Sequence, residues 1–137
     1  MNKNVIAISA CALLLTGCGA QESSVQEMQY IKSAVTYETM QDMYANPDNY
    51  LGKTFHIVGT LYPATDDDGE KFYSVYAKET QGDEGIGIEL DWNDYTGLED
   101  YDKITVEGTL ERTSGTHDGQ KIEYLILRVS MLEKRDQ

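Results

Sequence analysis

Two segments of the chain share one pattern, in which alternating apolar residues lead into Gly-Thr-Leu. They are TFHIVGTLYP at residues 54–63 and KITVEGTLER at residues 103–112. A period of two is typical of a β-strand with one buried face, and a glycine inside a strand marks a bulge or a sharp bend where a side chain would obstruct coiling. We therefore predict that the two strands bend at Gly59 and Gly108, as strands do at the corners of a small barrel.

Three further stretches have the same period of two, so the sequence predicts five strands in all. Runs of turn-forming residues separate them, among them the Asp-Asp-Asp-Gly run at residues 66–69 and the run at residues 114–119. The predicted strands span residues 53–62, 71–78, 85–92, 102–112 and 120–132.

A single helix is predicted before the first strand. Thr36 is a suitable N-cap, and the helix should end at Asn46, because the residue before a proline is pushed out of the α region. The helix carries one stripe of side chains at helical spacing, which we expect to pack on the core. This stripe consists of Tyr37, Met40, Met43 and Tyr44.

Pairing of the first predicted strand with the fourth would close the sheet, as happens in a five-stranded Greek-key barrel. These are the two strands that contain Gly-Thr-Leu. The sequence therefore predicts an all-β, five-stranded Greek-key barrel with an N-terminal helix. The alternative is a β-sandwich in which the repeat arises by chance. About 100 folded residues suffice for one such domain, which we place at residues 35–137.

The segment MYANPDNYLGK at residues 43–53, followed by a strand with Ile57-Val58-Gly59, resembles the entry to OB-fold domains of bacterial lipoproteins and exported proteins. The resemblance covers residues 36–132. It implies an OB-like barrel, similar in fold to nucleic-acid-binding OB domains, although many exported members have no assigned activity. The chain departs from the pattern at residues 93–101, which leave room for a turn or a single helical turn where a longer helix is often found.

The N-terminus has the features of a lipoprotein signal peptide at residues 1–17. Lys3 precedes an apolar run of 11 residues, 5–15, whereas a membrane-spanning helix needs about 20. The run ends in Leu-Thr-Gly-Cys, which resembles the lipobox in which the cysteine receives a diacylglyceryl group. We expect Cys18 to be lipidated, palmitate being a candidate acyl chain, and residues 18–34 to form a tether. The alternative is an ordinary signal peptide with a chance cysteine.

Lipid on Cys18 would hold the domain on the extracytoplasmic side of the cell membrane. Because Gly19 rather than aspartate follows the cysteine, sorting to the outer membrane stays open in a cell that has one. The other cysteine, Cys11, would be removed with the signal peptide. The mature chain is thus expected to have no disulfide, no thiol nucleophile and no cysteine metal site.

The chain is strongly acidic, with 11 basic and 24 acidic residues. The predicted signal peptide contains one lysine and no acidic residue, so the mature chain has a net charge of −14. Such a surface repels phosphate backbones, and we therefore expect no nucleic-acid partner despite the OB resemblance.

Two loops of the predicted barrel, residues 63–70 and 113–120, would meet at one rim of the ligand face that OB domains use. Oxygen ligands suit Ca²⁺, and a nearby imidazole suits a transition metal. The spacing is not that of an EF-hand, and solvated turns are the alternative interpretation. The candidate ligands of a weak Ca²⁺ or other divalent-cation site, with Asp67 beside them, are Asp66, Asp68, Glu70, His117 and Asp118.

Aromatic residues on the first three predicted strands are candidates for a stacking platform for sugars, peptides or bases. They are Tyr62, Tyr73, Tyr76 and Trp92. Phe72 and Tyr73 alternate, so only one of the two can point inward. The alternative is that these are ordinary, half-buried strand residues.

No motif of nucleophilic, metalloprotease or phosphate-loop chemistry is present, and His56 should face outward because it alternates with two apolar residues. We therefore expect a non-enzymatic, lipid-anchored binding or adaptor module of the bacterial cell envelope that needs no cofactor. Its partner would be an envelope protein or a small ligand. The alternative is a cation-binding lipoprotein that uses the acidic loops at residues 66–70 and 117–118.

Overall fold

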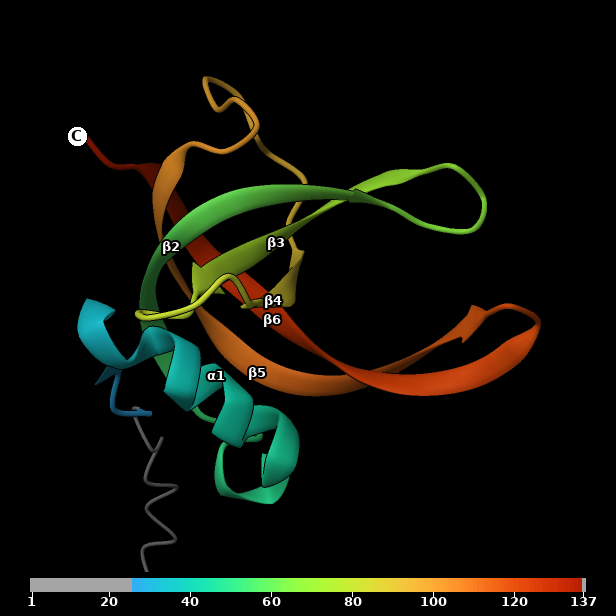
Figure 1. Cartoon of the computed structure of the whole chain (residues 1–137), viewed down its shortest axis with the longest axis horizontal. Helices are drawn as coiled ribbons and strands as arrows, with labels where there is room; N and C mark the ends of the chain where they lie inside the picture. The colour runs from blue at the N-terminus through green and yellow to red at the C-terminus, as the bar shows by residue number, and fades with distance from the viewer. Residues whose placement is uncertain (1–25, 137) are drawn as a thin grey trace, which may run out of the picture.

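Residues 26–136 are described by the computed structural model, so Cys18 and the predicted signal peptide lie outside the described residues. Five strands form a barrel, and helix α1 (Thr36–Ala45) lies across one end of it (Figure 1). No helix in the described part of the chain is long and apolar enough to cross a membrane. The barrel strands are β2 (Thr54–Thr65), β3 (Lys71–Lys78), β4 (Gly85–Asp91), β5 (Lys103–His117) and β6 (Gln120–Lys134).

The strands follow the order β2-β3-β4-β6-β5, and a ladder between β5 and β2 closes the barrel. In this ladder residues 54–60 pair antiparallel with residues 103–109, so the two Gly-Thr-Leu segments lie side by side, as predicted. The only parallel contact among the five strands joins β4 to β6. The predicted five-stranded OB-like barrel with an N-terminal helix is confirmed.

The two mid-strand glycines lie where neighbouring strands approach too closely for a side chain. A Cβ on Gly59 would be 2.8 Å from the carbonyl oxygen of Tyr76, and a Cβ on Gly108 would be 2.6 Å from that of Arg128. Gly59 lies just before β2 leaves β5 and begins to pair with β3. The pairing of β5 with β6 shifts register between Glu107 and Gly108. Both glycines therefore mark bends of the barrel.

Helix α1 covers one end of the barrel with two methionines, Met40 and Met43, which have no exposed surface. Burial of a side chain of this size stabilises a fold by roughly 1.5–3 kcal/mol. The barrel interior that they cover consists of Phe55, Ile57, Leu61, Val75, Ile88, Leu90, Ile104, Val106, Leu110, Leu125, Leu127 and Val129.

The helix ends as predicted but begins differently. Thr36 is its first residue rather than its N-cap, because the 3₁₀ turn η1 (Ser33–Val35) runs directly into α1. The Thr36 hydroxyl donates to the carbonyl of Lys32 instead, at 3.2 Å. At the other end, Asn46 leaves the α region, and the 3₁₀ turn η2 (Pro47–Asn49) follows. The prediction of Thr36 as N-cap was therefore wrong.

Part of the predicted tether belongs to the sheet, so the predicted boundary at residue 34 was wrong there. Strand β1 (Gln29–Tyr30) pairs parallel with residues 55–56 of β2. This edge of β2 is free because β3 pairs with β2 only from Thr60 onward. The Tyr30 ring lies 4.7 Å from the ring of His56, which fixes the segment further.

The predicted loop at residues 113–120 was also wrong, because β5 and β6 continue as a hairpin to a two-residue turn. Asp118 and Gly119 have φ angles of 50° and 76°, the two positive values that a type I′ turn requires. The β2–β3 hairpin is likewise longer than predicted and reaches Thr65. Both hairpins extend beyond the barrel in the same direction (Figure 1). We call these extensions the hairpin arms.

Candidate ligand groove between two hairpin arms

A groove of about 710 Å³ lies between the hairpin arms, and we call it the hairpin groove. Its volume is within the range of pockets that hold small ligands. Three apolar or aromatic side chains line it: Phe72, Ile122 and Tyr124. Five carboxylates line it as well: Asp66, Asp67, Asp68, Glu70 and Glu89. The other lining residues are Thr65, Lys71, Gly115, Thr116 and His117.

Strand alternation explains why these side chains face the hairpin groove. Tyr73 shares a face of β3 with the buried Val75 and packs against the core, so its neighbour Phe72 points the other way. Ile122 and Tyr124 likewise share one face of β6. Opposite Ile122 lies Gly115, which has no side chain to fill the space, and an added Cβ would be 3.1 Å from the Tyr124 ring.

The tips of the two arms touch, as the predicted meeting of the two loops requires. The backbone amide of Asp118 donates to Oδ2 of Asp67 at 2.9 Å. His117 lies between these two residues, with Nδ1 3.3 Å from Asp67 Oδ1 and Nε2 3.4 Å from Asp118 Oδ2. One potential ligand atom from each of the three residues lies within 4.8 Å of the others, and all three side chains are exposed.

The remaining candidate cation ligands lie outside this group of three. The Asp66 side chain stabilises its own turn, because its Oδ1 accepts hydrogen bonds from the amides of Asp68 and Glu70, each at 2.9 Å. The side chains of Asp68 and Glu70 line the hairpin groove. Of the predicted cation set, the structure therefore brings together only His117 and Asp118, with Asp67 as the third member.

Glu89 adds a negative charge from the side of the barrel. Burial, followed by repulsion from Asp91 and Asp66, raises the pKa of the Glu89 carboxyl. Burial and the charge of Glu89 also raise the pKa of the Tyr124 hydroxyl. Both shifts have the direction that a site rich in negative charge produces.

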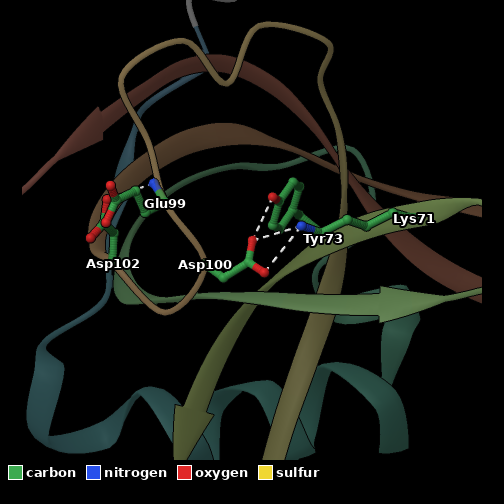
Figure 2. A network of polar contacts seen from close by, with 5 residues as sticks. All are labelled: Lys71, Tyr73, Glu99, Asp100 and Asp102. Atoms are coloured by element: carbon green, nitrogen blue, oxygen red, sulfur yellow. Dashed lines mark hydrogen bonds and ion pairs between the residues drawn. The ribbon is translucent and has the colours of Figure 1, made fainter.

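The one lysine that lines the hairpin groove has its charge engaged elsewhere. Lys71 Nζ donates to both carboxylate oxygens of Asp100, at 2.8 and 3.1 Å, and the Tyr73 hydroxyl donates to the same carboxylate at 2.7 Å (Figure 2). The hydrogen bond to Asp100 raises the pKa of Lys71 to about 12. Figure 2 also shows Asp102, which accepts a bond of 2.8 Å from the Glu99 amide. This network fixes the segment between β4 and β5, which consists of turns, as predicted.

The four predicted platform residues do not line the hairpin groove and do not form one surface. Tyr62 stacks on Tyr76 at 4.6 Å, and Tyr101 meets Tyr62 edge-on at 5.5 Å. Tyr73 instead contacts Tyr95 at 4.5 Å between ring centroids. Trp92 is half-buried against the core, and its indole nitrogen donates to the carbonyl of Asp94. Of the four, only Tyr62 and Tyr76 contact each other's rings, on the outward face of β2 and β3.

Sequence reasoning missed Phe72, Glu89, Ile122 and Tyr124 as groove residues. The signal that could have found the last two was the Asp-Gly pair at 118–119, which is a strong indication of a tight hairpin. Extending β5 and β6 up to that turn places Ile122 and Tyr124 on one face of a projecting arm. For Glu89, which lies on β4, no local signal in the sequence indicates that it borders the space between the two arms.

No protein-family model and no curated protein matches the chain. Among solved structures, a small single-stranded DNA-binding protein from Streptomyces coelicolor is similar, with 14% identity and a TM-score of 0.44; the match covers 61% of this chain and 94% of that one. The mitochondrial single-stranded DNA-binding protein Rim1 of S. cerevisiae gives 16% identity and a TM-score of 0.39; the match covers 61% of this chain and 94% of that one. The N-terminal domain of PriB from Thermoanaerobacter tencongensis gives 18% identity and a TM-score of 0.37; the match covers 61% of this chain and 97% of that one. The fold is therefore assigned from the strand order and the closing pairing of β2 with β5, not from these similarities.

Proposed function

We propose that the chain is a lipid-anchored, non-enzymatic binding module of the bacterial cell envelope and that the hairpin groove is its ligand surface. The observation that supports this most directly is the groove itself. Two arms reach past the barrel, touch at their tips through Asp67 and Asp118, and border an open groove of about 710 Å³. The stability of the barrel does not require this space, because the core lies inside the closed sheet.

The composition of the hairpin groove supports recognition rather than packing. Phe72, Ile122 and Tyr124 offer apolar surface, and Ile122 is 41% exposed. Carboxylates surround this apolar surface, as polar groups surround the apolar part of many ligand pockets. Mixed lining of this kind can hold a ligand through contact area and orient it through charge.

The arrangement of the chain supports presentation of this groove away from a membrane. In Figure 1 the first described residues lie at the left of the molecule, whereas both arms project to the right. With lipid on Cys18, only the ten residues 19–28 would separate the anchor from β1. A chain of that length spans at most about 35 Å, so the barrel would remain close to the bilayer, and the arms would project from the side opposite the attachment.

The positions of the two histidines in the mature chain favour binding over catalysis. His56 Nδ1 lies 2.8 Å from Glu107 Oε1, and its ring packs beside Tyr30, away from the hairpin groove. His117 is exposed at a hairpin tip between two carboxylates. A general base needs a substrate proton within hydrogen-bond reach in a site that excludes water, and neither position supplies such a setting.

The same charges oppose a nucleic-acid ligand. A protein that binds single strands needs a basic groove along its aromatic residues. Here the groove has five carboxylates, and its one lysine is paired with Asp100. We therefore propose a partner other than nucleic acid.

Site-directed photo-crosslinking tests the proposal. Benzoylphenylalanine is introduced in the cell at Ile122 or Phe72, with Val35 and Glu133 as exposed control positions outside the hairpin groove. We expect irradiation to give one discrete adduct, identified by mass spectrometry, from the two groove positions and not from the controls. The absence of an adduct at both groove positions, or equal adducts at all four, would contradict the proposal.

A second candidate function is cation binding at the arm tips. It is favoured by the grouping of Asp67, His117 and Asp118, whose potential ligand atoms lie within 4.8 Å of one another. Carboxylate oxygens suit Ca²⁺, and the imidazole extends the choice to Zn²⁺. Calorimetry with each ion, together with melting temperatures, tests it: no heat and no shift in melting temperature would end this alternative.

A further inference from the structure

The hairpin groove has an excess of unpaired negative charge. The carboxylates of Asp68, Glu70 and Glu89 form no hydrogen bond or ion pair with any residue in the range 26–136. The ammonium group of Lys71 is bound to Asp100. A ligand that brings positive charge would therefore lower the mutual repulsion of these carboxylates.

The β5–β6 arm also presents a free sheet edge to this space. Residues 120–125 of β6 pair with residues 112–117 of β5 on one side only. β4 reaches β6 no earlier than the pair Glu89–Ile126. Glu89 lines the hairpin groove at the point where β4 and β6 separate. The edge of β6 at residues 120–125, which precedes this point and does not pair with β4, therefore borders the groove. Backbone N–H and C=O groups on such an edge can pair with an added extended peptide.

The apolar lining fits the same ligand. Ile122 and Tyr124 lie on β6 itself, and Phe72 lies across the groove on β3. An extended peptide beside β6 would alternate its side chains about the plane of the sheet, so one set would reach this lining and the other set would face away. A polyamine or a metal ion could satisfy the charge, but neither has the backbone N–H and C=O groups that pair with a sheet edge.

We propose that the hairpin groove binds an extended, basic peptide segment of a partner protein, which adds as a strand to residues 120–125 of β6. Lysine or arginine side chains of the segment meet Asp68, Glu70 and Glu89, and backbone hydrogen bonds to β6 hold its direction. This inference rests on the proposed function of the groove and adds the chemical class of the partner.

The test uses the protein purified from cells in its processed form. The probe is the heptapeptide acetyl-Lys-Val-Lys-Val-Lys-Val-Lys-amide, and the comparison ligands are spermine and the same peptide with glutamate in place of lysine. We expect the lysine peptide to bind, the glutamate peptide not to bind, and spermine to bind at least about tenfold more weakly. Binding should weaken as salt rises, because exposed charges contribute to it.

Backbone pairing is tested separately from charge. Two further peptides carry N-methyl groups on all valines or on all lysines, which removes alternate N–H donors without changing the charge. At least one of the two should lose binding. Amide hydrogen exchange within residues 120–125 should slow when the unmethylated peptide is bound and stay unchanged with spermine.

A matched pair of triple variants separates the groove from the net charge of the chain. Asp68→Asn/Glu70→Gln/Glu89→Gln removes the three unpaired groove carboxylates, and we expect it to weaken lysine-peptide binding by about tenfold or more. Glu38→Gln/Asp83→Asn/Glu133→Gln removes three carboxylates from exposed positions outside the groove and should change binding less than about twofold. Circular dichroism shows whether each variant is folded.

The inference is overturned if the lysine peptide fails to bind or if spermine binds as tightly. It is also overturned if both N-methylated peptides bind like the parent or if the two triple variants weaken binding equally. Any of these results, combined with a specific adduct at Ile122, would leave the proposed function intact and remove only the basic-peptide partner. The loss of that adduct would remove the proposed function as well.

Discussion

The backbone amide of Asp118 donates a hydrogen bond to Oδ2 of Asp67 and so joins two hairpins whose tips are 51 residues apart in the sequence. This bond closes the far end of the hairpin groove. His117 reinforces it, because its ring lies between the two carboxylates. The far end of the groove is therefore held by exposed contacts between the two tips rather than by the barrel core.

Asp67→Ala removes this contact and should loosen both tips. Because the contact is exposed, we expect a loss of less than about 1 kcal/mol in the free energy of unfolding. Amide hydrogen exchange at residues 113–120 should nevertheless become faster. Asp68→Ala, at the neighbouring position, is the control and should leave the exchange unchanged. Equal exchange in the Asp67 variant and the parent chain would show that the tips are held by other means.

Gly108→Ala should destabilise the barrel by about 1–3 kcal/mol, the usual cost of forcing extra atoms into a packed interior. The added Cβ would be 2.6 Å from the carbonyl oxygen of Arg128, a backbone atom that cannot move independently of β6. The control is Gly82→Ala, whose Cβ would meet only the side chain of Glu79, which can rotate away. Urea unfolding of both variants measures the difference. A cost at Gly108 no larger than that at Gly82 would contradict the bend at this position.

Asp100→Asn should make stability less dependent on pH at both ends of the scale. Hydrogen bonds from Lys71 and Tyr73 lower the pKa of Asp100, so its contribution is present above the unfolded value of about 3.9 and is lost as the pH falls further. The raised pKa of Lys71, about 12, places the loss at high pH between about 10.5 and 12. Melting temperatures from pH 2 to 12 should therefore separate parent and variant most strongly near neutral pH. Asp48→Asn removes a carboxylate whose ion-pair distance is 3.7 Å and should show a smaller separation.

Glu89→Gln should stabilise the fold slightly at neutral pH. The raised pKa of Glu89 means that its ionised form costs the folded state free energy above that pKa, and protonation removes the cost as the pH falls through it. We expect a gain of up to about 0.5 kcal/mol, or about 1–3 °C in melting temperature, which disappears below about pH 4. Glu133→Gln, on the exposed end of β6, should not show this pattern. A variant that is less stable than the parent at pH 7 would contradict it.

Cys18→Ser should abolish lipid attachment, because the diacylglyceryl group is bound through the thiol. Incorporation of a labelled fatty acid, followed by the intact mass of the processed protein, measures this directly. Cys11→Ser is the matched control, since this residue lies in the segment that should be removed, and it should leave the label unchanged. A label that persists in the Cys18→Ser variant would contradict the predicted anchor.

The barrel could be predicted from the sequence because its determinants are local and repeated. Gly59 and Gly108 interrupt two strands of equal pattern, and Met40 and Met43 lie at helical spacing before them. The sequence predicts arms that are too short, because the run of turn-forming residues at 114–119 is typical of one loop. Only Asp118 and Gly119 form the turn, and their positive φ angles let the strands continue up to them.

The lining of the hairpin groove could be predicted only in part because it depends on the relative positions of distant segments. The sequence indicates that the two acidic loops meet, and the bond between Asp67 and Asp118 agrees with this. It does not indicate that Tyr73 points toward Tyr95 and Asp100 while Phe72 faces outward. Alternation leaves both choices open, and packing at the end of the barrel decides between them.

The two-residue strand β1 has a mechanical consequence for a chain held at its N-terminal side. A pull from that side reaches the sheet first through Gln29 and Tyr30, and their two pairs with β2 would yield long before the seven pairs between β2 and β5. Detachment of β1 would lengthen the segment between the N-terminal side and the barrel and would leave the barrel closed. In a chain anchored at its N-terminal side, the short strand would therefore detach before the barrel opens.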